Sequence, residues 1–144
     1  MVEATTADVF RQLAIGSVVI AVIVSIQAEM YTLYSDRFES LLLWVRPRLR
    51  RFTNTGMTVT SILYILLVMT IEVWIWAAVL FVVGAVHAFE PALYFALVCF
   101  STLGLGDITL SHEWRILSAM IAANGFLMFG WSTAYIVELI RLTR

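Results

Sequence analysis

Three long apolar stretches constrain this chain more than any other feature. They cover residues 12–33, 57–89 and 115–140, and each exceeds the roughly 20 residues that a helix needs to cross ~30 Å of hydrocarbon. Of all residues 62% are hydrophobic, 13% are charged and none is lysine, whereas about 25% of the residues in a soluble domain are charged. The sequence therefore predicts an all-α membrane protein with three transmembrane helices.

A fourth apolar stretch, Pro91–Ser101, is too short to cross a bilayer. Its length is typical of a re-entrant or interfacial helix, and Pro91 suits the first turn of such a helix. The loop TLGLGD at 102–107 follows directly. Glycine permits positive φ angles, and non-helical backbone at membrane depth is tolerated only inside protein or along an aqueous cavity. These features predict a re-entrant helix that returns through a loop with exposed carbonyl groups.

Charge asymmetry predicts the orientation. Seven of the nine basic residues follow the first stretch or end the chain: Arg37, Arg46, Arg48, Arg50, Arg51, Arg141 and Arg144. The positive-inside rule places these arginines in the cytoplasm and the N-terminus outside. The connector 35–52 is then expected to include a helix on the anionic leaflet, broken at Pro47, with lipid contacts at Arg46, Arg48, Arg50 and Arg51. A bacterial inner membrane suits so compact a chain.

The short helix and its loop, set between two spanning stretches, resemble the pore of the potassium-channel family, whose filter reads TVGYG. The chain is most similar to compact prokaryotic channels with one pore loop per chain, over about residues 57–142. The resemblance implies an extra N-terminal helix and connector in residues 1–56, and a pore module in residues 57–144. It also implies a homotetramer that conducts K⁺ passively, with no enzymatic activity and no cofactor besides K⁺ in the filter.

The same resemblance assigns roles around the loop. Gly106 would lie at the outer mouth of the filter, and Asp107 would cap the filter and hydrogen-bond toward Tyr94 on the short helix. Dehydrated K⁺ would be coordinated by the Thr102 hydroxyl and by the carbonyl groups of Thr102, Leu103, Gly104 and Leu105.

The third long stretch would be the inner helix of the pore. There the resemblance places Phe126, Phe129 and Thr133 along the cavity. Gly125 matches a family glycine, and it is either a hinge or a site of close helix packing. Asn124 faces either the cavity or a neighbouring helix, where it would hold two helices together.

Two departures from the family pattern keep alternatives open. Leu105 replaces the usual Tyr or Phe, and Val98 stands where some members have a glutamate that pairs with the filter aspartate. One alternative is therefore a weakly selective Na⁺/K⁺ channel. The other is a non-conducting scaffold or accessory subunit that keeps a degenerate loop.

Glu72 lies near the middle of the second stretch. A carboxylate at that depth is costly, and burial disfavours its charged form. Glu72 is thus either a pH sensor that makes gating proton-dependent or a hydrogen-bonded structural residue. Gln27 and Glu29, near the end of the first stretch, are expected to pair with neighbouring polar groups.

Overall fold

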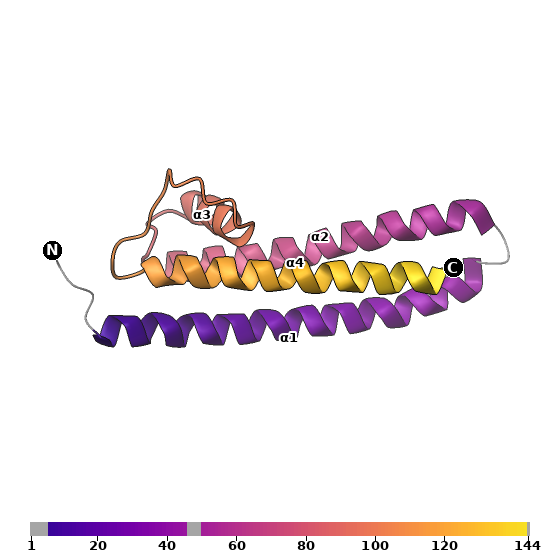
Figure 1. The fold of residues 1–144 in the computed structure, drawn as a ribbon, viewed down its shortest axis with the longest axis horizontal. Helices are drawn as coiled ribbons and strands as arrows, with labels where there is room; N and C mark the ends of the chain where they lie inside the picture. The colour runs from indigo at the N-terminus through magenta and orange to yellow at the C-terminus, as the bar shows by residue number, and fades with distance from the viewer. Residues whose placement is uncertain (1–5, 46–49, 144) are drawn as a thin grey trace.

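The computed structural model describes residues 6–45 and 50–143 of the chain. Three long helices lie along one another, and the short helix α3 lies beside them near the end where α1 and α4 begin (Figure 1). The helices are α1 (Thr6–Val45), α2 (Arg50–Val82), α3 (Phe89–Phe100) and α4 (Arg115–Thr143).

The long helices contain segments that are apolar enough to cross a membrane. These segments are Thr6–Arg37, Thr58–Val82 and Arg115–Arg141, whereas α3 is apolar but too short. The described residues contain helices and no strands. The predicted all-α membrane fold, with three spanning helices and one short helix, is therefore confirmed.

The first helix is longer than predicted. Residues 35–45, the first part of the predicted connector 35–52, are helical and continue α1 without a break. No glycine or proline occurs between Gly16 and Pro47, so nothing interrupts the helical hydrogen bonds before that proline. Pro47, Arg46, Arg48 and Arg144 lie outside the described residues, and the predictions for them remain untested.

The second helix ends earlier than predicted, at Val82 instead of residue 89. Gly84 has a φ of 75°, a conformation that glycine adopts readily and that commonly ends helices. The N–H groups of Ala85 and Val86 both donate to the carbonyl of Leu80, at 3.0 and 3.3 Å. This turn separates α2 from α3.

The core lies where α2, α3 and α4 meet. Its largest fully buried apolar side chains there include Trp76 and Leu80 from α2, Phe100 from α3, and Leu117 and Ile121 from α4. Packing against two long helices thus fixes the position of α3, whose twelve residues would make a marginal helix alone.

Tyrosine hydroxyls join α1 to α4 near the middle of their lengths. Ser132 Oγ donates to the Met128 carbonyl at 2.7 Å, so the Tyr31 hydroxyl donates to Ser132 Oγ, also at 2.7 Å. Tyr135 donates to the Tyr31 carbonyl at 2.9 Å, and the two rings stack 4.1 Å apart. Lipid offers no water to polar groups, so hydroxyl groups in a membrane bond to neighbouring helices instead. These hydrogen bonds hold α1 against α4 of the same chain.

Two more tyrosines set the register of α1 against α2. Tyr64 donates to the Met30 carbonyl at 2.7 Å, and the hydroxyls of Tyr34 and Ser61 are 3.0 Å apart. The rings of Tyr34 and Tyr64 stack with centroids 4.4 Å apart. The N-terminal helix is therefore an integral part of the bundle.

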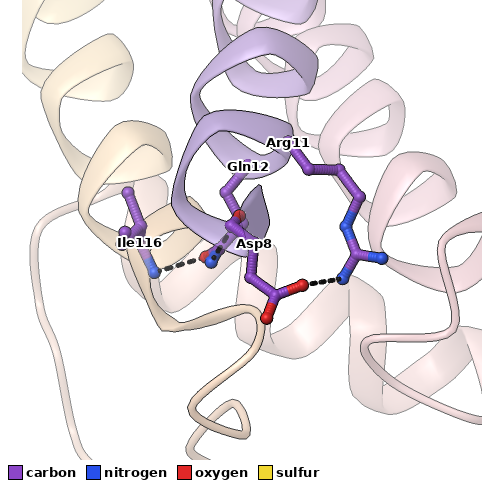
Figure 2. A network of polar contacts seen from close by, with 4 residues as sticks. All are labelled: Asp8, Arg11, Gln12 and Ile116. Carbon is purple, nitrogen blue, oxygen red and sulfur yellow. Dashed lines mark hydrogen bonds and ion pairs between the residues drawn. The ribbon is translucent and has the colours of Figure 1, made fainter. Parts of the chain in front are cut away.

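A polar network anchors the start of α1 to the start of α4 (Figure 2). The buried Gln12 accepts a hydrogen bond from the Ile116 N–H at 2.9 Å and donates to the Asp8 carbonyl at 3.3 Å. Arg11 pairs with the Asp8 carboxylate at 3.5 Å, and its guanidinium lies 4.5 Å from the Trp114 ring centroid. Because the first N–H groups of a helix have no partner within that helix, Gln12 acts as a cap for α4.

We expect Gln12→Leu to loosen this end of the bundle. The substitution leaves the Ile116 N–H without its acceptor, at a cost of about 1–3 kcal/mol. Thermal unfolding in detergent should show a lower midpoint for the variant. Phe10→Leu, which changes an exposed side chain in the same turn region, is the control and should leave the midpoint nearly unchanged.

Candidate ion-conducting site

The loop at 102–107 is tied to the last turn of α3. The N–H of Thr102 donates to the Cys99 carbonyl at 2.9 Å. The N–H groups of Leu103 and Gly104 both donate to the Val98 carbonyl, at 3.0 and 3.3 Å. The end of α3, held between α2 and α4, therefore positions the first half of the loop.

The backbone of the loop alternates in conformation. Thr102, Gly104 and Gly106 have φ angles of 58°, 58° and 78°. Thr102 is the only non-glycine residue with a positive φ in the described part of the chain, and such strained residues cluster at functional sites. Within that part, no carbonyl from Thr102 to Gly106 accepts a hydrogen bond. The loop therefore offers free carbonyl oxygens, the ligands that hard cations prefer.

Tyr94 and Asp107 connect the middle of α3 to the far end of the loop. The Tyr94 hydroxyl donates to Asp107 Oδ2 at 2.6 Å, which places the two residues as the resemblance predicts. This bond raises the pKa of Tyr94, and it lowers the pKa of the Asp107 carboxyl, which also accepts from the N–H groups of residues 107 and 108. Leu105, between the two bonded ends, remains 58% exposed in the single chain.

We expect Tyr94→Phe to raise the pKa of Asp107. The hydroxyl stabilises the charged carboxylate, so its contribution to stability is present above the unfolded-state pKa of Asp107 and is lost as pH falls through the lower folded-state pKa. Carboxyl carbon NMR of labelled protein would measure the shift. A pKa of Asp107 that is the same in the variant and the wild type would contradict this role of Tyr94.

The predicted cavity residues share an open face of α4. Phe126 is 75% exposed, and Phe129 and Thr133 are also exposed in the single chain. The Phe129 ring lies 5.9 Å from the Phe100 ring at the end of α3. These side chains are therefore not covered by the rest of the single chain, as the predicted cavity position requires.

Asn124 does not belong to that face. It is 2% exposed, and its Oδ1 accepts a hydrogen bond from Trp76 Nε1 at 2.9 Å. The cavity-facing alternative for Asn124 is therefore wrong for this structure, and Asn124 instead holds α4 to α2. A polar side chain in lipid gains more from a partner on a neighbouring helix than from an apolar surface.

Gly125 marks a close contact between α4 and α3. A Cβ atom at this position would overlap the backbone carbonyl group of Phe100, and α4 continues through residue 125 as a helix. The packing alternative for Gly125 thus has a direct structural basis. The hinge alternative remains an untested prediction.

Glu72 on α2 and Gln27 on α1 are unusual buried polar residues of the helix bundle. Both are 0% exposed, and no side-chain oxygen or nitrogen of either residue has a hydrogen-bond partner. The expectation that Gln27 pairs with a neighbouring polar group is thus not met in this structure, and Glu29 is exposed. The residues described also contain no cluster of three or more His, Cys, Asp or Glu that could hold a metal.

Sequence reasoning missed Trp76 and Phe100. Trp76 is the hydrogen-bond donor to Asn124, and Phe100 is the backbone contact of Gly125. The spacing of Glu72 and Trp76, one helical turn apart, was a signal that both residues face the interior of the bundle. No pattern in the sequence indicated that the end of α3 touches Gly125.

Comparison with known proteins agrees with this geometry. The family described as "Ion channel" matches residues 68–142, which run from the second half of α2 through α3 and the loop to the end of α4. No curated protein and no solved structure matches the chain. The match covers just over half of the 144 residues and confirms the resemblance to a channel pore family. The chain therefore belongs to the ion channel family of multi-pass membrane proteins.

Proposed function

We propose that the chain is a subunit of a potassium-selective channel, and that the loop at 102–106 is its selectivity filter. The observation that carries this proposal is the alternating backbone with its free carbonyl oxygens. Carbonyl oxygens replace the hydration shell of K⁺ in filters of this kind. The Tyr94–Asp107 hydrogen bond supports the proposal because it braces the outer end of the loop.

One loop supplies only one side of an ion path, so several copies must surround the axis. We propose a homotetramer, as the resemblance to potassium channels implies. The exposure of Leu103, Leu105 and Phe126 supports assembly, because these large apolar side chains lie next to the free carbonyls and on the open face of α4. In this assembly residues 57–144 form the pore module, and α1 packs on the outside of α2 and α4.

The proposed orientation has the N-terminus outside and the C-terminus in the cytoplasm. The start of α2 and the end of α4 lie at the end of the bundle opposite α3 (Figure 1). Arg50 and Arg51 begin α2 and Arg141 is in the last turn of α4, as the positive-inside rule requires if the filter faces outward. Anionic lipids would bind near Arg46, Arg48, Arg50 and Arg51. The proposed location is the bacterial inner membrane.

A cation flux assay with purified protein tests this function. Native mass spectrometry should give a mass of four chains, and liposomes that contain the protein should release K⁺ faster than Na⁺. Equal release of both ions would favour a weakly selective channel, which the absence of a filter aromatic at Leu105 also favours. Tetramers that release neither ion under any condition would contradict the proposal and favour the scaffold alternative.

A further inference from the structure

The interior of the three-helix bundle holds an unusual set of polar atoms. In the described residues, the buried side-chain atoms without a hydrogen-bond partner belong to three residues, one on each long helix. They are both oxygens of Glu72 on α2, both polar atoms of Gln27 on α1, and Nδ2 of Asn124 on α4. Buried polar groups are otherwise almost always hydrogen-bonded, so this cluster requires a specific explanation.

Register places Gln27 and Glu72 near the same depth. The Tyr34–Ser61 hydrogen bond fixes α1 against the antiparallel α2. Counting from it at about 1.5 Å per residue puts Gln27 and Glu72 within about one helical turn of each other along the bundle. Side chains lean toward the N-terminus of their own helix, so in antiparallel helices these two side chains lean toward each other.

Both residues also face the interior. Gln27 shares its buried face of α1 with Ile23 and Tyr31, and Glu72 shares its face of α2 with Val68 and Trp76. Tyr31 lies within electrostatic range of Glu72. The geometry therefore brings a carboxyl group and a primary amide to one small region between α1 and α2.

Among the side chains that the structure describes, none with a positive charge is buried beside Glu72. The arginines whose side chains are described, Arg11, Arg37, Arg115 and Arg141, are all exposed. The titratable side chains in the hydrophobic core that α1, α2, α3 and α4 share are Tyr31, Tyr64, Cys99 and Tyr135, and each of them is neutral or becomes negative. An unpaired carboxylate is strongly disfavoured in such surroundings, whereas a neutral acid is not.

We propose that Glu72 carries a proton at neutral pH and that this acid pairs with the Gln27 amide, directly or through one water, to fasten α1 to the pore module. A protonated carboxylic acid presents one donor and one acceptor side by side, and so does the edge of a primary amide that carries its oxygen and one N–H. Their pairing satisfies the polar atoms of Glu72 and Gln27 together. A carboxylate only accepts hydrogen bonds, so loss of the proton leaves Gln27 Oε1 facing a negative charge.

The pair is connected to the loop by direct contacts. Trp76, one turn from Glu72, donates to Asn124, and the next residue, Gly125, touches the backbone of Phe100 at the end of α3. Loss of the proton is therefore expected to weaken the packing of α1 against α2 and α4, the two helices that hold α3 and its loop in place. This regulatory consequence, unlike the proton itself, rests on the proposed function.

Infrared spectroscopy of the full-length protein in lipid tests the proton directly. At neutral pH we expect a carbonyl stretching band of a protonated carboxylic acid that is lost in Glu72→Gln and kept in Glu29→Gln, the exposed control on α1. Gln27→Leu should shift this band to higher frequency, because the acid loses its hydrogen-bonded partner. Glu72→Gln retains the shape of the side chain and can pair amide to amide, so it should fold.

Two results would overturn the proposal. The absence of a Glu72-dependent band at neutral pH would show that the residue is ionised, and a band unmoved by Gln27→Leu would show that Gln27 is not its partner. For the regulatory consequence, K⁺ flux should change in one step over the pH range in which the band disappears, and Glu72→Gln should lack that step. A band with no flux at any pH would contradict the proposed channel function instead, and flux without a step would contradict only the regulation.

Discussion

Gly104→Ala is expected to abolish most K⁺ flux while leaving assembly intact. Gly104 has a φ of 58°, a conformation that costs a residue with a Cβ atom about 1–2 kcal/mol. No atom lies within 4 Å of the position that a new Cβ would occupy, so the penalty falls on the backbone of the loop and not on packing. Because each ~1.4 kcal/mol changes a rate about tenfold and every copy carries the change, flux should fall by at least about tenfold.

The matched control for this variant is Gly56→Ala. Gly56 lies in α2, its added Cβ would also meet nothing within 4 Å, and its φ is not positive. Flux through liposomes and native mass spectrometry should be measured on both variants. If Gly104→Ala conducts as well as the Gly56→Ala control, the loop is not an ion path and the scaffold alternative is favoured.

Gly125→Ala should destabilise the protein and impair conduction together. The added methyl group would overlap the carbonyl of Phe100, so α3 must move away from α4. Overpacking of this kind typically costs about 1–3 kcal/mol. We expect a lower thermal unfolding midpoint in detergent and a reduced K⁺ flux, because Phe100 lies two residues before Thr102.

Gly130→Ala separates packing from helix propensity. Gly130 lies in the same helix with nothing within 4 Å of its added Cβ, and alanine is favoured over glycine inside a helix by about 1 kcal/mol. This variant should keep or slightly raise the unfolding midpoint. A Gly125→Ala variant with unchanged stability but altered gating would instead support the hinge alternative.

Helix existence and membrane class could be predicted because they depend on local composition. The apolar runs that form α1, α2 and α4 are long enough to span a membrane, and the run that forms α3 is too short. Length alone therefore separates the spanning helices from the short helix, without any tertiary information. The Tyr94–Asp107 contact could also be anticipated, because a known family places an aromatic residue and an aspartate at these positions. Helix ends were harder to predict. Gly84 ends α2 before residue 89, and α1 runs to Val45 because nothing breaks it.

The contacts between helices could not be read from the sequence. Which polar residue meets which depends on register and rotation, and these are fixed only when whole helices pack. Gln12 with Ile116, Trp76 with Asn124, and Tyr31 with Ser132 join positions between 48 and 104 residues apart. Asn124 illustrates the limit: its polarity was evident, but its direction toward α2 depends on the position of the Trp76 side chain.

The reversal potential of the purified channel in a planar bilayer, under opposed K⁺ and Na⁺ gradients, tests the central claim most directly. If the carbonyl groups of the 102–106 loop replace the hydration shell of K⁺ and select it over Na⁺, the current should reverse near the K⁺ equilibrium potential. Gly56→Ala should reverse at the same voltage, and Gly104→Ala should carry little current at any voltage. Ample wild-type current that reverses near zero would contradict potassium selectivity and leave a non-selective cation pore in its place.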